Sequence, residues 1–468
     1  MVHSQKMAQQ LAQQTVRTLS QPFSRKHLPV PEIGNWLLPF SKLAIANTLS
    51  HLLVPLAGLV DTAFLGHLSD VRYLNGVALA TVIFNVIYWG FNFFRMGTTG
   101  PTAQALGKGN LDEVWLILAR NSLLALGAGV LVWLLRSLIA TVGFALLQAE
   151  PDVRLAAMDF YDGRITGAPA VLLNYVLLGW LLGQSKGKQV VLLAAISSSS
   201  NILLDYWFIR RLGMESYGAG LATALSQYIM LIVGALILSR TIPWHRWRAI
   251  KPQLWQPKAL LSLFNLNRDI LVRTFALVIS MSLFTNFSSV LGSTVLGVNA
   301  ILMQVVLMSA YFMDGVALAV ESYAGKFYGA SEKGDLYGLL LLGMSSSVAL
   351  GVAIALCLML LPMQFFPLMT KHAELLDEVP RYVGWLLLVL GFGGAAFTLD
   401  GYFLGLTDGR SLRNSTLMAA LVGFLPLALI ANELALPHLL WLALVSLMVT
   451  RTIALLRKVP ATLLRAES

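Results

Sequence analysis

The sequence has very little cysteine and little charge. Cys357 is the single cysteine among 468 residues, which excludes an intrachain disulfide and any pair of thiols for metal or redox chemistry. Only 12% of the residues are charged, whereas 57% are hydrophobic. A water-soluble chain of this composition could not cover its surface with polar groups. The composition therefore favours an integral membrane protein.

Catalytic signatures are also missing. The chain contains no H-E-x-x-H pair, no Walker lysine loop and no dinucleotide-binding glycine motif, which mark metalloproteases, ATP-driven pumps and nicotinamide enzymes respectively. Residues Gly183 to Gly187 match the G-x-S-x-G pattern of hydrolases, but that pattern requires a strand-to-helix turn. We therefore predict that the protein is not an enzyme and that it has no cofactor other than a coupling ion.

Long apolar runs are what the sequence has in abundance. A helix needs about 20 mostly apolar residues to cross a bilayer, and a continuous run without alternation favours a helix over a half-buried strand. We predict an all-α polytopic membrane protein with twelve transmembrane helices, near residues 36–65, 74–100, 114–147, 163–183, 190–209, 217–240, 270–291, 297–322, 337–368, 382–406, 413–432 and 438–456.

The basic residues indicate the orientation of these helices. The net charge of +10 would suggest a nucleic-acid partner in a soluble protein, but here most Lys and Arg fall in alternate loops, as the positive-inside rule describes. We expect both termini in the cytoplasm, a bacterial-type inner membrane and no nucleic-acid partner. An organellar membrane is the alternative, because residues 1–31 contain Arg and Ser but no acid, as transit peptides do.

The two halves of the chain resemble each other. The segment Gly179–Lys188 aligns with Gly401–Arg410 at an offset of 222 residues, and Gly107-Lys108 aligns with Gly325-Lys326 at an offset of 218. Nearly equal offsets indicate a duplication. Because each half contains an even number of predicted spans, the repeats would have the same orientation and be related by a pseudo-twofold axis along the membrane normal.

This repeat predicts two six-helix lobes around a central cavity that opens alternately to the two sides of the membrane. The longest linker separates the lobes and carries Trp244, Trp247 and Trp255 among basic residues, which favours a segment at the membrane interface. The predicted organisation is a cytoplasmic N-terminal tail (1–34), an N-lobe (35–240), a cytoplasmic linker (241–267), a C-lobe (268–457) and a cytoplasmic C-terminal tail (458–468).

Ionisable residues within spans are functional candidates, because hydrocarbon disfavours them. In the first half these are Asp61 and Asp205, with Asn201 one helical turn before Asp205, and with Asn174 and Thr223 on neighbouring spans. Two carboxylates, two amides and a hydroxyl could form an oxygen cage for Na⁺ or a carboxyl pair that binds a proton. Interfacial positions at the outer ends of their spans are the alternative for both acids.

The second half has a different set of polar residues. Asp314 and Glu321 are seven residues apart and share a helix face, and Asp400 lies in the tenth span. They could form a gate on the cytoplasmic side, or the first two could be a pair that reaches toward the interface. Arg95 lies close to the repeat-equivalent position of Asp314, so a salt bridge between the lobes is a further hypothesis.

Four segments together resemble the DinF branch of the multidrug and toxic compound extrusion (MATE) family: Gly58–His67, Arg95–Gln104, Leu177–Gly183 and Asn265–Ile270. The resemblance extends from about Leu37 to Arg457. It implies two six-helix lobes, a central cleft, and antiport of organic, often cationic or amphipathic, compounds against H⁺ or Na⁺.

The resemblance also implies roles for particular residues. The family's first-helix acid corresponds to Asp61, its fifth-helix Asn-x-x-x-Asp pair to Asn201 and Asp205, its sixth-helix threonine to Thr223, and a fourth-helix asparagine to Asn174. Relatives usually have a proline fifteen residues before the first-helix acid, where this chain has Ala46. The helix bending that is linked to that proline is therefore in question here.

From these features we expect a monomeric secondary antiporter whose partners are small organic substrates and membrane lipids. One alternative is a carrier of the same architecture without ion coupling. Another is a flippase for lipid-linked precursors, which would need a strongly cationic cleft for pyrophosphate. The sequence places only Arg95 clearly within a span, which argues against the flippase.

Overall fold

The computed structural model describes residues 33–68, 70–241, 248 and 250–465, with backbone only for residues 33, 54–57 and 465. This part of the chain is almost entirely helical and contains no strand. Within it, eleven helices are long and apolar enough to cross a membrane, or twelve if the bent pair Pro151–Ile165 and Ala168–Gly183 forms one span. The prediction of an all-α membrane protein is therefore confirmed.

The N-lobe follows the order of the predicted spans. Its helices are α2 (Ile33–Gly66), α3 (Arg72–Phe91), α4 (Phe93–Gly107), α5 (Leu111–Leu134), α6 (Arg136–Ala145), α7 (Pro151–Ile165), α8 (Ala168–Gly183), α9 (Gly187–Asp205), the π-helical η2 (Tyr206–Arg211) and α10 (Glu215–Ser239). The fourth span therefore begins at Pro151 rather than near residue 163. Its first part, α7, is rich in charged residues, which is why a search for apolar runs misses it.

The C-lobe repeats this pattern. After the short η3 (Lys251–Trp255) come α12 (Pro257–Val290), α13 (Ser293–Ala330), α14 (Lys333–Leu360), α15 (Pro362–Phe365), η4 (Phe366–Leu368), α16 (Ala373–Tyr382), α17 (Trp385–Gly405), α18 (Gly409–Met418), the π-helical η5 (Ala419–Phe424), α19 (Leu425–Glu433), α20 (Pro437–Leu456) and α21 (Val459–Arg465). Because α12 begins at Pro257, the second part of the predicted linker 241–267 is helix that continues into the seventh span. Trp255 is exposed in η3, whereas Trp244 and Trp247 lie outside the described residues.

The turns between helices carry a clear trace of the duplication. Gly109 and Ser331, Ser185 and Thr407, and Gly213 and Ala435 are three pairs separated by 222 residues, and all six residues have a positive φ. This left-handed backbone conformation is unfavourable for residues other than glycine, so its recurrence at one offset reflects a shared backbone. Ser185 connects two helices, α8 and α9, and therefore does not lie in a strand-to-helix elbow.

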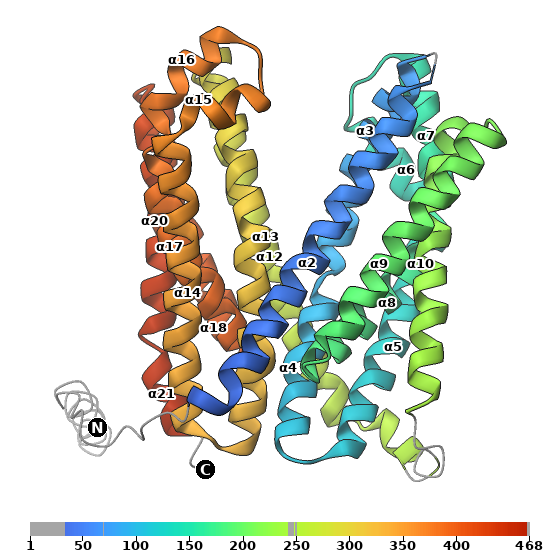
Figure 1. Cartoon of the computed structure of the whole chain (residues 1–468), viewed down its shortest axis with the longest axis vertical. Coiled ribbons are helices and arrows are strands. Elements are labelled where there is room, and N and C mark those ends of the chain that lie inside the picture. Colours follow the sequence, from blue (N-terminus) through green and yellow to red (C-terminus); the bar gives the residue numbers. More distant parts are fainter. Residues whose placement is uncertain (1–32, 69, 242–247, 249, 466–468) are drawn as a thin grey trace, which may run out of the picture.

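The two lobes form a V (Figure 1). They meet at the end of the molecule where α2 begins and α21 lies, and they diverge toward the end that carries α3, α7 and α16. Each lobe has its own apolar core, around Phe84 and Phe160 in the N-lobe and around Phe284 and Trp441 in the C-lobe. The lobes are therefore separate packing units that touch at one end.

Helix α2 connects the two lobes. Near its start, Trp36 Nε1 donates to Asp335 Oδ1 of the C-lobe at 3.0 Å, and Asn47 Nδ2 donates to the carbonyl oxygen of Gly315 at 3.4 Å. Further along, α2 runs beside α9 of the N-lobe. A change in the packing of α2 on α9 can therefore act on the contact between the lobes.

Glycines bring the backbones of the two lobes into direct contact at the closed end. A Cβ atom on Gly107 would lie 2.1 Å from the carbonyl oxygen of Lys326, and one on Gly329 would lie 2.3 Å from that of Gln104. The Gln104 side chain also donates to the carbonyl oxygen of Gly405 at 2.9 Å. A side chain larger than that of glycine would therefore not fit at Gly107 or Gly329 while the two lobes are in contact at this end.

We predict that Gly329→Leu opens this end of the molecule, because its side chain would overlap the backbone of α4. Gly127→Leu is the matched control, since nothing lies within 4 Å of a Cβ at Gly127. Spin labels on Lys108→Cys and Glu332→Cys, in a Cys357→Ser background, would report the separation of the two lobes. A longer distance should dominate in Gly329→Leu and not in Gly127→Leu, and an unchanged distance in Gly329→Leu would contradict the prediction.

Candidate functional site

A cavity of about 530 Å³ lies between the lobes. The N-lobe contributes most of its wall through α2, α3, α4, α7, α8, α9 and α10, and the C-lobe contributes parts of α12 and α13. The wall is mainly apolar, with Met96, Leu178, Leu307 and Leu318 among its residues. Such a wall suits the hydrocarbon part of an organic molecule, and the few polar groups would orient it.

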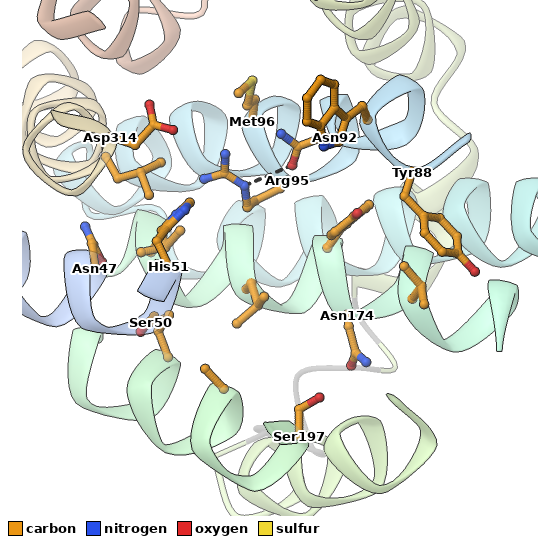
Figure 2. A pocket seen from close by; sticks show the side chains of 18 of the residues that line it. Asn47, Ser50, His51, Tyr88, Asn92, Arg95, Met96, Asn174, Ser197 and Asp314 are labelled. Carbon is orange, nitrogen blue, oxygen red and sulfur yellow. Dashed lines mark hydrogen bonds between the residues drawn. The ribbon is translucent and has the colours of Figure 1, made fainter. Parts of the chain in front are cut away.

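Several polar side chains face this cavity, as Figure 2 shows for Arg95, Asp314, His51 and Asn92. Arg95 Nε donates to Asn92 Oδ1 at 3.1 Å, while its Nη1 is buried without a partner. Among the described residues, no ion pair within 4.0 Å joins Arg95 to Asp314. Two of the candidate gate residues thus line one cavity from opposite lobes without direct contact.

Glu321 and Asp400, the other two candidate gate residues, are not among the residues that line the cavity. Glu321 on α13 is buried beside α4 near Thr99, and neither of its carboxylate oxygens has a hydrogen-bond donor. Asp400 on α17 forms ion pairs with Arg273 of α12 and Arg451 of α20. All three groups of this cluster belong to the C-lobe, so Asp400 joins helices within one lobe rather than across the lobes.

Arg273 and Arg451 are charged residues that the sequence did not single out as candidates. The structure places both within long apolar helices, where they are almost fully buried. Arg273 and His51 are separated by 222 residues and both line the cavity. A sequence reading that counts only charge per loop misses them, because their partner Asp400 is distant in the chain.

The structure brings the two acids of the N-lobe together. The carboxyl groups of Asp61 on α2 and Asp205 on α9 lie close enough for the charge of each to act on the other, and Asp205 is fully buried. Oδ1 of Asp61 and both carboxylate oxygens of Asp205 have no donor. Two ionised carboxylates in contact repel each other strongly away from water, so this pair requires a shared proton or a bound cation.

The three other predicted residues lie on α8, α9 and α10. Asn201 lies one turn before Asp205 on α9, and its buried Nδ2 has no acceptor. Thr223 on α10 lines the cavity and donates its hydroxyl hydrogen to the carbonyl oxygen of Ala219 at 3.0 Å, which leaves the lone pairs of its oxygen free for a cation.

Asn174 takes part in a network that sequence reasoning missed. Its Nδ2 donates to the side-chain oxygen of Gln227 at 3.1 Å, and Gln227 donates to Ser197 Oγ at 3.1 Å. The network joins α8, α10 and α9 along the cavity wall. Gln227 could have been found from the sequence, because it lies four residues after Thr223 and so shares its helix face.

Arg164 is a further cavity residue that the sequence did not single out. It lies at the end of α7, just before the 53° bend into α8, and it lines the cavity. Its guanidinium lies 4.6 Å from the ring centre of Phe84 and 5.5 Å from that of Phe160. Because α7 is rich in charged residues, a search for apolar runs does not place Arg164 in the wall of a cavity.

The MatE family model matches the chain twice, over residues 47–207 and 270–430. The DNA damage-inducible protein F of Escherichia coli (strain K12) is 34% identical over 88% of this chain and 90% of its own length. The probable multidrug resistance protein NorM of Thermotoga maritima is 23% identical over 75% of this chain and 76% of its own length.

Solved structures show the same fold. A MATE protein in the bent conformation has a TM-score of 0.82 at 19% identity, covering 93% of this chain and 98% of that one. A transporter of the MOP superfamily from Pyrococcus furiosus, described as having a binding pocket of reverse polarity, has a TM-score of 0.78 at 18% identity, covering 92% of this chain and 95% of that one.

The Asp400 cluster leads to a prediction about stability. Asp400→Asn would leave two buried guanidinium groups without their counter-charge, which we expect to destabilise the protein by about 3–5 kcal/mol. Asp377→Asn, which changes an exposed acid of the same lobe, is the control. Thermal unfolding of the two purified variants in detergent would measure the effect, and equal melting temperatures would contradict the structural role of Asp400.

Proposed function

This chain belongs to the MatE family of multidrug and toxin extrusion transporters, and on that premise we propose that it exports cationic or amphipathic organic compounds in exchange for H⁺ or Na⁺. As a member of that family, it is an integral membrane transporter of the drug-efflux type rather than an enzyme. The observation that carries the ion-coupling proposal is the buried contact between Asp61 and Asp205, whose oxygens lack donors.

The chemistry of this site suits either coupling ion. A proton shared by the two carboxyls removes their repulsion. A Na⁺ ion does the same and prefers the hard oxygens that Asp61, Asp205, Asn201 and Thr223 would offer. Because the two acids belong to different helices, loading the site changes the force between α2 and α9.

Helix α2 would convert that change into alternating access. Asp61 lies in its second half, whereas Trp36 and Asn47 in its first half hold the C-lobe. The place of the usual proline is Ala46, whose Cβ lies 3.1 Å from the position of a Cβ on Gly187 at the start of α9. Close packing of α2 on α9 at this point would therefore take the place of a proline bend.

A flippase for lipid-linked precursors is the second candidate, because three guanidinium groups line the cavity rather than the single one that the sequence predicted. They belong to Arg95, Arg164 and Arg273. The ion pair of Arg273 with Asp400 and the mainly apolar wall favour the antiporter. An uncoupled carrier is distinguished from both by its lack of response to an ion gradient.

We further propose that the transporter works as a monomer in a bacterial-type inner membrane, with both termini in the cytoplasm and without a cofactor. The beginning of α2 and the final helix α21 lie at the same end of the molecule (Figure 1), which supports termini on one side of the membrane.

We predict that Asp61→Asn and Asp205→Asn each abolish ion-driven efflux from proteoliposomes, because an amide can neither bind a proton nor carry the charge that attracts Na⁺. Substrate exchange without an ion gradient should persist, since the cavity is left intact. Asp159→Asn, an exposed acid of the same lobe, should behave as the original protein. Efflux of Asp61→Asn at the original rate under an imposed ΔpH and ΔNa⁺ would remove Asp61 from the mechanism.

Thr223→Val separates the two coupling ions. The substitution keeps the shape of the side chain but removes an oxygen that could bind Na⁺. If Na⁺ is the coupling ion, we expect a loss of Na⁺ affinity of about tenfold, on the scale of one lost polar contact, with the response to ΔpH unchanged. If only H⁺ couples, transport driven by ΔpH should be near the original level and Na⁺ should have no effect on either protein.

A further inference from the structure

Arg164 has an environment that the mechanism above does not use. Its side chain is half-buried and borders the cavity, and its Nε is buried without an acceptor. Its backbone is held in place because α7 packs tightly on α10, where a Cβ on Gly220 would lie 2.9 Å from the amide nitrogen of Arg164. Gly220 is one turn before Thr223, so Arg164 is fixed next to the helix that completes the ion site.

Few charged groups surround this guanidinium. Around it are the rings of Phe84, Phe160 and Tyr88, the phenol of Tyr175 on α8, and the carboxylate of Asp61, whose charge acts on it from α2. In the part of the chain that the structure describes, no carboxylate lies within 4.0 Å of Arg164. A guanidinium held away from bulk water needs a counter-charge, and Asp61 with its partner Asp205 is the nearest acidic group that acts on Arg164.

We propose that Arg164 is the internal counter-cation of the Asp61–Asp205 pair and that it transmits the loading of this pair to the substrate cavity. The inference rests on the proposed ion coupling and names the residue that performs it. While the pair carries negative charge, the field of Arg164 is largely cancelled at the cavity. When H⁺ or Na⁺ binds, the pair loses one unit of negative charge, so the positive charge of Arg164 is less compensated in a wall of low dielectric.

The consequence depends on the charge of the substrate. An organic cation in the cavity is repelled when the ion site is loaded, which is the competition that antiport requires. A neutral molecule of the same shape is unaffected, and an anion is bound more tightly. At separations of the order of 10 Å and an effective dielectric constant of about 20, one unit charge changes an affinity by about tenfold.

The test uses three probes with one skeleton. Each carries pyrene on a four-carbon chain that ends in a trimethylammonium group, a neutral methyl amide or a carboxylate. Their affinities for the purified full-length protein are measured by fluorescence with the ion site unloaded and loaded, at low and high Na⁺ and at alkaline and mildly acidic pH. The pH series is repeated in His51→Gln, because His51 also lines the cavity and can titrate.

We expect loading to weaken binding of the cation about tenfold, to leave the amide unchanged and to strengthen binding of the carboxylate. Arg164→Gln should abolish this dependence on charge, while Arg164→Lys should retain it. Arg136→Gln is the matched control, since Arg136 is an exposed arginine of the same lobe that also lies over an aromatic ring, 4.9 Å from that of Trp133. It should respond as the original protein does.

Asp61→Asn gives a test in which Arg164 is unchanged, so its result does not depend on how Arg164→Gln folds. Because Asp61→Asn imitates the loaded pair, it should by itself weaken binding of the cation without added ion. In the Arg164→Gln background it should have no such effect. A charge-dependent response that persists in Arg164→Gln overturns the role of Arg164 and leaves the antiporter proposal intact. Absence of any response to ions in the original protein overturns both.

Discussion

A charge inside a bilayer requires an opposite charge nearby, and the rest of this structure depends on how the two lobes meet that requirement. In the C-lobe, Asp400 binds Arg273 and Arg451 directly, so the charges there are fixed by contact. In the N-lobe, Asp61 and Asp205 touch each other and have no cation within ion-pair distance in the described part of the chain. The first arrangement is satisfied by contacts within the protein. In the mechanism that we propose, the second needs an ion from solution in addition to the long-range charge of Arg164, and that difference makes the N-lobe the responsive one.

The same helix that carries Asp61 also carries the contacts that hold the closed end. Trp36 and Asn47 bind the C-lobe at one end of α2, and the acid lies near the other. At the closed end the backbones of the two lobes are in contact through glycines such as Gly107 and Gly329. Because close-packed backbones do not deform gradually, this interface is either tightly closed or open. A modest force on α2 can therefore select between two discrete arrangements.

Much of this architecture could be predicted from the amino-acid sequence, because apolar length and repeated turn motifs are local signals. The spans, the duplication and the pairing of Asp61 with Asp205 follow from features within one or two helices, and family resemblance strengthens them. The roles of Arg164, Arg273 and Arg451 do not follow from such features. Their partners are distant in the chain: Asp400 for Arg273 and Arg451 and, in our proposal, Asp61 for Arg164. The contact of Asp400 with two arginines from other helices has no local signature.

The duplication explains why the two lobes can differ so much in chemistry. Their turns kept the same strained backbone at an offset of 222 residues, since a change there would alter the direction of the helices. The residues that correspond to Asp61 and Asp205 are Leu283 and Leu427, and the one that corresponds to Arg164 is the buried Leu386. Apolar packing at these places makes the C-lobe a rigid body against which the N-lobe can move. An ion site in both lobes would need two loading events per cycle, whereas the single site that we propose in the N-lobe would set one switch for the contact between the lobes.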